Sequence, residues 1–503
     1  MDDNMVTTAA QAENRTVLRN IARRAMLQRG LLPEFSSQAV AELAGIAAPA
    51  KVGQAKEARD LRDLLWASID NDDSEDLDQL TVAEAMPEGR TKIRVAVADV
   101  DALVRKGSAI DHDAQANTTS VYTAAQIFPM LPLKLSTDLT SLNLNQDRLA
   151  VVVEMVIGPD GTLLESDVYR AAVRNHAKLA YNSVDAWLEE KTPPPLAVAQ
   201  VPGLAENLLL QDRAAQRMKN LRHAQGALSL ETIEAKPVFE GERIRELQVE
   251  EKNRAKEIIE DFMIAANGVT VRYLASRNIP SIRRVVRIPR RWDRIVEIAA
   301  EHAFKLPKNP NARKLEMFLT MMKSADPLRF PDLSLAVIKL LGNGEYVAEL
   351  PGEEATGHFG LAVKDYTHST APNRRYPDLI TQRLLKAALE GRPVPYSPDE
   401  LDFLAENCTK KEDAATKVER QVSKSAAALL LESRIGEQFE AMVTGASEKG
   451  TWVRLLDIPV EGMLKSGFKG VDVGDQIQVE LVSVDVEKGF IDFERIGPGN
   501  KIK

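Results

Sequence analysis

The feature that most constrains this chain is a run of acidic residues: six of the nine residues from Asp70 to Asp78 are Asp or Glu, directly after the apolar segment 66–69. Carboxylates crowded in this way repel one another unless water or a cation separates them. Hard cations such as Mg²⁺ favour carboxylate sites that also hold phosphate. A calcium-binding loop is excluded by register, because its sixth position would be Glu75 instead of Gly and its twelfth Thr81 instead of Glu. The run is therefore either a solvated acidic loop or a site for a divalent cation.

Composition limits the kinds of protein that can carry such a run. The chain has 503 residues, which is enough for about three domains, and 44% of them are apolar. The net charge of −9 argues against a protein that is basic throughout, so a nucleic-acid site would have to be a local basic channel. The single cysteine, Cys408, excludes an internal disulfide and a Cys-rich zinc module, and the six scattered histidines disfavour a zinc hydrolase.

The N-terminal residues and the lone thiol bear on the cellular compartment. The chain begins with acidic residues where a signal peptide needs basic ones, and no apolar run is long enough to span a membrane. A single free thiol fits a reducing environment. We therefore expect a cytoplasmic protein that acts as a monomer without membrane contact, and the sequence identifies no protein partner.

The pattern of apolar residues divides the chain into three parts. Residues 1–50 have helical periodicity. Residues 58–433 begin with β-rich segments, among them residues 177–184, and turn helical from about Val249. The helical pattern there puts five apolar residues on one face: Ile258, Phe262, Ala265, Ala266 and Val269. Residues 434–497 contain five short strands separated by turns, which is typical of a small closed barrel. The predicted fold class is α+β multidomain, with an N-terminal helical domain, a central mixed α/β domain and a C-terminal five-stranded OB-fold barrel.

The N-terminal helices have a pattern that is compatible with a helix-turn-helix-like domain. Ser36 and Ser37 are suitable N-caps for a second helix. Much of one side of the first helix is basic, and this side is either a solvated face or a reader of DNA; its arginines are Arg15, Arg19, Arg23 and Arg24.

Three long segments carry a resemblance to a known family. The first starts with Arg59-Asp60-Leu61-Arg62 and ends in the acidic run, the second contains SVY, PMLP, LS, SL and RLA in that order within residues 120–150, and the third is HFGLAVKDYTHSTAPNRRYPDL at residues 358–379. In this order they resemble the RNB catalytic domain of the ribonuclease II family of exoribonucleases, over residues 58–430. The C-terminal barrel resembles the RNA-binding OB-fold module named after the largest small-subunit ribosomal protein. In family members two cold-shock barrels usually precede the RNB domain, and the helical N-terminal segment replaces them here.

The resemblance implies a metal site and a phosphate-binding arginine. The metal-site acids of the family fall on Asp70, Asp76 and Asp78, with Mg²⁺ as the metal and Mn²⁺ as its substitute. Gln79 stands where the family has a fourth Asp, and its neutral carbonyl oxygen is a weaker ligand. Asp78 and Arg374 are the expected catalytic residues. Two metal ions would activate the attacking water, and the guanidinium fork of Arg374 would bind the scissile phosphate.

The resemblance also implies residues that bind single-stranded RNA. Tyr122 matches the family position that stacks on the terminal bases, and Phe239 resembles its partner on the other side of the stack. Arg375 would face phosphate together with its neighbour, and Glu419 matches a helical glutamate that reaches the last nucleotide. Trp452 in the barrel is either a surface stacking platform or a core residue. Core packing is the alternative for Tyr122 and Phe239 as well.

The resemblance implies an Mg²⁺-dependent, processive 3′→5′ exoribonuclease that acts on single-stranded RNA and releases nucleoside 5′-monophosphates. The main alternative is a relative that binds RNA without cutting it, because Gln79 replaces a metal ligand. A third hypothesis makes the N-terminal helices a DNA reader. The third segment also departs from the family, with Ser369 in place of Phe and Ala-Pro-Asn in place of Ser-Pro-Ile at residues 371–373.

Overall fold

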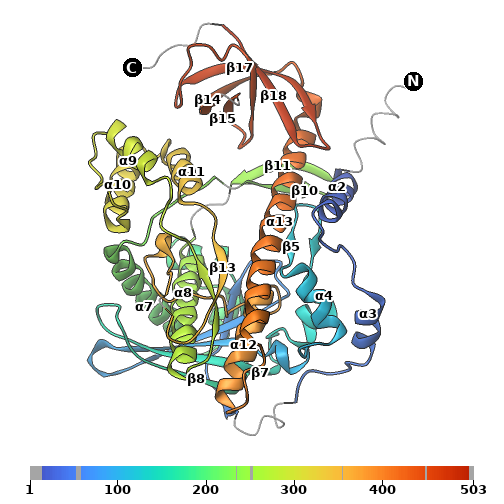
Figure 1. Ribbon diagram of the computed structural model, residues 1–503, viewed down its shortest axis with the longest axis vertical. Helices are drawn as coiled ribbons and strands as arrows, with labels where there is room; N and C mark the ends of the chain where they lie inside the picture. Colours follow the sequence, from blue (N-terminus) through green and yellow to red (C-terminus); the bar gives the residue numbers. More distant parts are fainter. Residues whose placement is uncertain are drawn as a thin grey trace.

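A mixed β-sheet and a small β-barrel lie at opposite ends of the molecule, and a long helix, α13 (Pro398–Leu431), runs between them (Figure 1). The computed structural model describes residues 14–51, 58–233, 235–249, 253–353, 355–447 and 450–497. Both the sheet and the barrel are therefore connected to one continuous helical element.

The sheet has seven strands in the order β1-β8-β7-β4-β3-β2-β9. The outer pairs β1/β8 and β2/β9 are parallel, and the other neighbouring pairs are antiparallel. Nearly every residue of β7 is buried, because helices and loops cover both faces of the central strands. The strands are β1 (Arg59–Asp60), β2 (Ala67–Asp70), β3 (Gln79–Ala85), β4 (Thr91–Ala98), β7 (Asp147–Ile157), β8 (Leu163–Arg174) and β9 (Ala177–Ala180).

One β-rich prediction is only half right. Residues 177–184 were expected to be extended, but β9 ends at Ala180 and helix α5 (Tyr181–Leu188) begins at the next residue. The segment is too short for its apolar residues to distinguish the two-residue repeat of a strand from the 3.6-residue repeat of a helix. Val184 is buried, but it belongs to the helix.

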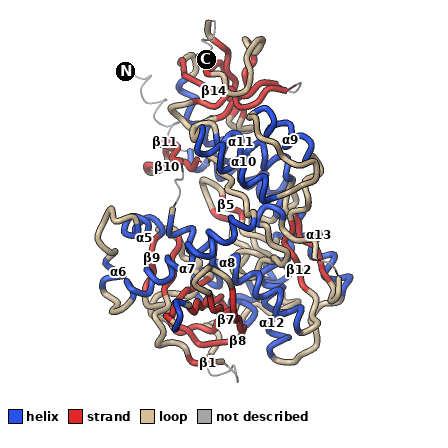
Figure 2. Tube along the Cα trace, turned by 90° about the vertical axis from the view of Figure 1, so that its left-hand side faces the viewer, coloured by secondary structure: helices blue, strands red, loops and turns tan. Residues whose placement is uncertain are grey.

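Helices pack on the sheet and enclose the main core. α8 (Arg254–Ser276) buries Ile258, Phe262, Ala266 and Val269 on one face, as the sequence predicts, whereas Ala265 is only half-buried. α7 (Leu204–Gln225) packs beside it, as Figure 2 shows, and α12 (Tyr376–Leu389) is almost wholly buried. Among the described helices, none is long and apolar enough to cross a membrane.

The remaining elements of the central part surround this core. Three helices, α9, α10 and α11, form a separate cluster with its own apolar centre at one side of the molecule (Figure 1). The other ranges are α4 (Ala109–Asn117), α6 (Leu196–Ala199), α9 (Trp292–Glu301), α10 (Ala312–Ala325), α11 (Phe330–Leu341), and the strand pairs β5 (Val121–Tyr122) with β6 (Ile127–Phe128), β10 (Ala235–Glu240) with β11 (Arg243–Val249), and β12 (Ser281–Val285) with β13 (Glu345–Glu349).

The N-terminal segment is helical as expected, with α2 (Asn14–Gln28) and α3 (Ser37–Ala44), and Ser36 caps α3 by accepting from the Ala39 N–H. The two helices pack on different elements of the chain. α2 packs on α13, and α3 packs on α4 and contributes Ala39 to the main core. Residues 1–13 of this predicted domain lie outside the described residues.

Three of the four N-terminal arginines contact this chain instead of forming a free basic face. Arg15 lies over the Phe239 ring, Arg23 pairs with Glu34, and Arg24 pairs with Glu487 of the barrel. These contacts give no support to the DNA-reader hypothesis, because the guanidinium groups already have partners within the chain.

The C-terminal barrel is closed and has five strands, which confirms the prediction. Its strand order is β14-β15-β16-β18-β17. The turn before β18 approaches α13 closely at Gly489, which has a φ of 66° and where a Cβ would lie 3.0 Å from the carbonyl carbon of Lys424. The strands are β14 (Gln438–Ser447), β15 (Gly450–Leu455), β16 (Glu461–Ser466), β17 (Gln476–Asp485) and β18 (Phe490–Arg495).

Candidate active site

Asp78 lies at the centre of the candidate site and is only 2% exposed. The main chain at this point is fixed, because the Ala98 N–H donates to Asp78 O (2.9 Å) and the Leu77 N–H donates to Ser141 Oγ (3.0 Å). The side chain is fixed too: the Asn373 N–H donates to Oδ1 (3.0 Å). The fold therefore brings the acidic run to the third motif, almost three hundred residues later in the chain.

Arg374 holds the other oxygen of this carboxylate. Its Nε donates to Asp78 Oδ2 (3.2 Å), while 40% of the Arg374 side chain stays exposed. Among the described residues, Asp78 is the one acid that pairs with Arg374. Because only one edge of the guanidinium is occupied in this way, its outer edge can bind an anion such as phosphate.

Arg375 has a different position from its neighbour. Its guanidinium donates to both oxygens of Asp378 (2.9 and 2.8 Å), and Asp378 is fully buried in the first turn of α12. Asp378 Oδ1 also accepts the Ala371 N–H (2.8 Å). Arg375 thus fixes the loop that presents Arg374, and its guanidinium is already occupied by a carboxylate.

The three acids of the run influence one another. Burial raises the pKa of Asp78 to about 7, and the Asp76 carboxylate adds to this shift while Arg374 opposes it. Burial also raises the pKa of Asp76, and Asp70 contributes to that shift. The site therefore stores carboxylate repulsion that a cation would relieve.

The acidic run offers oxygen ligands of the kind that a divalent metal ion needs. In the described part of the chain no three Asp, Glu, His or Cys side chains converge as a complete metal-binding group. Mg²⁺ is commonly held by one or two carboxylates, with water and substrate phosphates as its other ligands. Asp70, Asp76 and the carbonyl oxygen of Gln79 fit that pattern, whereas the Asp78 carboxylate already accepts from Asn373 and Arg374.

Tyr122 borders the same site, with its ring 40% exposed. Its hydroxyl donates to Asp76 Oδ2 (3.4 Å), and burial of that end raises the pKa of the phenol above its usual value. The Tyr122 N–H donates to Glu419 Oε1 (2.8 Å), and burial raises the pKa of Glu419. Glu419 of α13 therefore lies next to Tyr122 and holds its main chain. The contact of Glu419 with the last nucleotide stays a prediction.

Main-chain bonds connect the loop that carries Tyr122 to the loop that carries Arg374. The Ser120 N–H donates to Arg374 O (2.9 Å), and the Tyr376 N–H donates to Thr118 O (2.8 Å). Tyr122 and Arg374 are consequently placed by one short ladder of bonds. A displacement of either loop changes the position of the other.

Tyr181 is a site residue that the sequence analysis missed. It follows Ala180, which is the register partner of Asp70 in the β2/β9 pair. Burial and the nearby Asp70 raise the pKa of the Tyr181 phenol, and Arg374 is close enough to oppose the shift. The signal that could have found it was the change from strand to helix at this residue, which directs the start of α5 to the edge of the sheet where Asp70 ends β2.

Phe239 and Trp452 are not brought to this cluster by any described contact. Phe239 lies in β10, packed against the apolar group that includes Val121 of β5, with the Arg15 guanidinium 4.5 Å from its ring centre. Trp452 lies in β15 of the barrel, partly exposed and beside Gly445 and Gly450. Their predicted contacts with RNA stay predictions.

The departures in the third motif form polar contacts. Ser369 Oγ donates to Asn267 Oδ1 (2.8 Å) within the core. Thr140 Oγ1 lies 2.8 Å from Leu135 O and 2.5 Å from the Asn373 amide. The Thr140 hydroxyl has one proton, which it donates to Leu135 O. The second contact is then a hydrogen bond if the Asn373 side-chain NH₂ donates to Thr140 Oγ1. The loop that holds Asp78 is thus anchored by hydrogen bonds instead of apolar contacts.

Comparisons with known proteins identify the domains that this chain resembles. The model of the RNB domain matches residues 58–391, and the model of the RNase II-type exonuclease C-terminal S1 domain matches residues 437–496. Ribonuclease R of Aquifex aeolicus (strain VF5) is 30% identical over 470 residues, which cover 88% of this chain and 65% of that protein. Ribonuclease R of Escherichia coli (strain K12) is 29% identical over 485 residues, which cover 88% of this chain and 58% of that protein. The chain thus spans less than two thirds of the length of these relatives.

Two solved structures are similar in fold. The Mycoplasma genitalium RNase R in complex with ribose methylated single-stranded RNA has a TM-score of 0.85 at 22% identity, with 96% of this chain and 78% of that chain covered. Yeast Ssd1, a pseudonuclease, has a TM-score of 0.67 at 16% identity, with 88% and 53% covered. Because the RNB model matches more than half of the sequence, this chain belongs to the RNB-domain family of exoribonucleases, and its barrel is the S1 domain of the RNase II type.

Proposed function

We propose that this chain is a processive 3′→5′ exoribonuclease that hydrolyses single-stranded RNA and releases nucleoside 5′-monophosphates. The observation that carries the proposal is the buried Asp78 carboxylate, held between the Asn373 N–H and Arg374 beside the exposed ring of Tyr122. The RNB and S1 domain matches support the reaction class. The solved RNase R with bound single-stranded RNA supports the substrate class.

Each residue of the site has a distinct role in this proposal. The outer edge of Arg374 binds the nonbridging oxygens of the scissile phosphate and stabilises the charge that develops there. Asp78 fixes the orientation of Arg374 through Nε. Tyr122 stacks on a terminal base, and Glu419 holds the Tyr122 main chain so that the ring stays beside the phosphate site.

The metal in this proposal is Mg²⁺, for which Mn²⁺ can substitute. RNB ribonucleases are generally dependent on a divalent metal. Asp70, Asp76 and Gln79 would hold it, and when bound it supplies an activated water and neutralises phosphate charge. The neutral Gln79 contributes less attraction than a carboxylate would, so we expect a weaker metal affinity than a site with a fourth acid has.

A second function is favoured by Gln79. An RNA-binding protein without nuclease activity would keep the aromatic and basic contacts and lose part of the metal site. The fold is compatible with both outcomes, since a pseudonuclease and an RNase R are both among its structural neighbours. This alternative predicts tight binding of single-stranded RNA with no turnover at any metal concentration.

A degradation assay decides between the two functions. Oligo(A) labelled at its 5′ end is incubated with the full chain and Mg²⁺, and products are resolved by length. Stepwise shortening from the 3′ end with release of AMP supports the nuclease, and no shortening with Mg²⁺ or Mn²⁺ contradicts it. Gln79→Asp is the informative variant: a higher rate than wild type shows that the missing carboxylate limits the reaction.

We also propose that the chain acts as a monomer in the cytoplasm. The lone thiol of Cys408 is buried in α13, where burial raises its pKa, so it is unsuited to form a disulfide with another molecule. Light scattering of the purified chain gives the mass in solution, and a dimer mass at micromolar concentration contradicts the proposal.

A further inference from the structure

A basic cavity of about 480 Å³ lies at the C-terminal end of α12. Arg374 lies two residues before the other end of this helix, and its 14 residues span about 20 Å. Seven of the thirteen residues that line the cavity are Lys or Arg, and two are acidic. The cavity is thus distinct from the candidate active site and has its own charge character.

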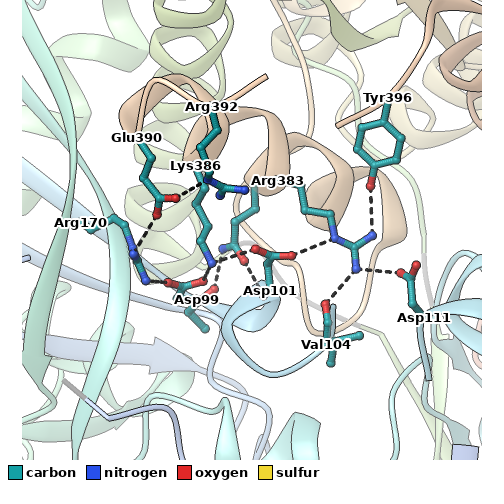
Figure 3. Close-up of polar contacts among 12 residues, drawn as sticks. Asp99, Asp101, Val104, Asp111, Arg170, Arg383, Lys386, Glu390, Arg392 and Tyr396 are labelled. Atoms are coloured by element: carbon teal, nitrogen blue, oxygen red, sulfur yellow. Dashed lines mark hydrogen bonds and ion pairs between the residues drawn. The ribbon is translucent and has the colours of Figure 1, made fainter. Parts of the chain in front are cut away.

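Buried carboxylates neutralise some of these cations. Figure 3 shows a chain of ion pairs along one wall, in which acids from the segment after β4 alternate with basic residues of α12 and β8. The pairs are Asp99 with Arg170 (2.7 Å) and Lys386 (2.8 Å), Asp101 with Lys386 (2.8 Å) and Arg383 (3.0 Å), and Asp111 with Arg383 (2.7 Å). This wall is therefore rigid and close to neutral.

Two further carboxylates complete the balance. Glu390 pairs with Arg392 and with Arg170, as Figure 3 also shows, and Glu400 pairs with Lys106 (2.8 Å). Five carboxylates then face five cations. The wall is neutral up to this point.

Arg105 and Lys51 leave the cavity positive. Neither side chain has an ion-pair partner or a hydrogen bond among the described residues, and both are exposed. The buried Nε of Arg170 has no acceptor in the described part of the chain either. Relative to the balanced pairs, the cavity therefore carries an excess of two positive charges together with an unused donor.

We propose that this cavity binds a small phosphate monoester of nucleotide size, with Arg105 and Lys51 as its phosphate-binding residues. A phosphate monoester carries about −1.5 to −2 charges at neutral pH, which matches the excess. Arginine binds phosphate oxygens through paired N–H groups, and lysine adds a point charge. Ligand pockets of about 300–1,000 Å³ hold molecules of this size. The apolar lining residues Leu149 and Pro395 offer contacts for a sugar or base.

The binding site does not depend on the proposed nuclease activity. A nuclease of this kind would release molecules of this chemistry, and free phosphate is a second source of the same anion. AMP, inorganic phosphate and adenosine therefore serve as separate probes. AMP and phosphate should compete for the site, whereas adenosine should compete at least tenfold more weakly than AMP.

The test compares the full chain with a Lys51→Gln/Arg105→Gln double variant by equilibrium dialysis of labelled AMP in metal-free buffer. We expect AMP binding to weaken at least tenfold in the double variant. A matched double variant, Arg213→Gln/Lys308→Gln, removes two exposed cations that have no ion pair in the described residues, and it should bind AMP as wild type does. An Arg374→Ala variant should retain this AMP site, since it changes only the candidate active site.

Several results would overturn the proposal. Two concern the site itself: unchanged AMP binding in the Lys51→Gln/Arg105→Gln variant, and no AMP binding by wild type at millimolar concentration. Two concern its location and chemistry: complete loss of AMP binding in Arg374→Ala, and displacement of AMP by adenosine as effectively as by phosphate. Displacement by a twenty-residue oligo(A) but not by phosphate would assign the wall to an RNA path and would equally overturn it. Cleavage of oligo(A) by the double variant, measured separately, reports on the nuclease proposal alone.

Discussion

Replacement of Asp78 by Asn tests whether this carboxylate acts in catalysis or in folding. The variant keeps the size of the side chain and removes its charge. The amide can still accept the Asn373 N–H, but its NH₂ group then faces the Arg374 Nε, which is also a donor. The ion pair that orients Arg374 is therefore lost.

The structure gives the expected size and direction of two effects. Loss of one oriented donor to developing transition-state charge lowers a rate roughly 10²–10³-fold, and we expect a loss of that size when Asp78 no longer holds Arg374. Stability should respond in the opposite direction. Burial raises the pKa of Asp78 to about 7 in the folded protein. The wild-type protein therefore loses about 4 kcal/mol of stability as the pH rises from below the pKa of Asp in the unfolded chain to above 7. Asn avoids that loss.

Single-turnover cleavage of 5′-labelled oligo(A), filter binding of the same RNA, and thermal unfolding at pH 8 measure the three quantities. We expect slow cleavage, RNA affinity that is unchanged or higher, and a Tm at or above that of wild type. Asp73→Asn is the matched control, because Asp73 is exposed in the same acidic run. This variant should cleave RNA at the wild-type rate. Full activity of Asp78→Asn, or an equal loss in the control, would refute the reasoning.

Three further predictions follow from other contacts. Tyr122→Ala should weaken binding of oligo(A) by about 1–3 kcal/mol and lengthen the final uncut product, as seen on sequencing gels; an unaltered end product together with lost cleavage would contradict the stacking role. Arg375→Ala should lower the Tm, because it leaves the fully buried Asp378 without its partner at a cost of about 3–5 kcal/mol; thermal unfolding measures this, and a wild-type Tm would show that Arg375 is free for RNA. Asp261→Asn should change the pH dependence of stability: burial raises the pKa of Asp261 to about 6, so wild type loses about 3 kcal/mol relative to the variant between pH 4 and pH 7, and parallel stability curves from urea titrations would contradict it.

The sequence was sufficient where chemistry resides in the identity of a residue. The family resemblance and the five-stranded barrel are confirmed, and the apolar period of α8 correctly predicts its buried face. The predicted acids, Arg374 and Tyr122 meet in one site because the three motifs carry them at recognisable spacings. These predictions needed no knowledge of which loop contacts which.

The sequence was insufficient where a role depends on the main chain or on distant packing. The donor to Asp78 Oδ1 is the backbone N–H of Asn373, which any non-proline residue possesses. Glu419 contacts the Tyr122 main chain across nearly three hundred residues, and only the fold makes that contact. The periodicity of α2 and α3 predicts an apolar face on each helix without revealing which element that face packs on. α2 packs on α13 and α3 on α4.

The continuity of α13 restricts how the length of this protein can vary in evolution. Between Glu419, beside Tyr122, and the end of the helix at Leu431, each inserted or deleted residue would turn the barrel about 100° around the helix axis and shift it by about 1.5 Å. Such a turn would break the Arg24–Glu487 and Arg454–Asp332 ion pairs and the close approach at Gly489. Insertions and deletions should therefore be confined to loops, while this stretch of helix keeps a constant number of residues.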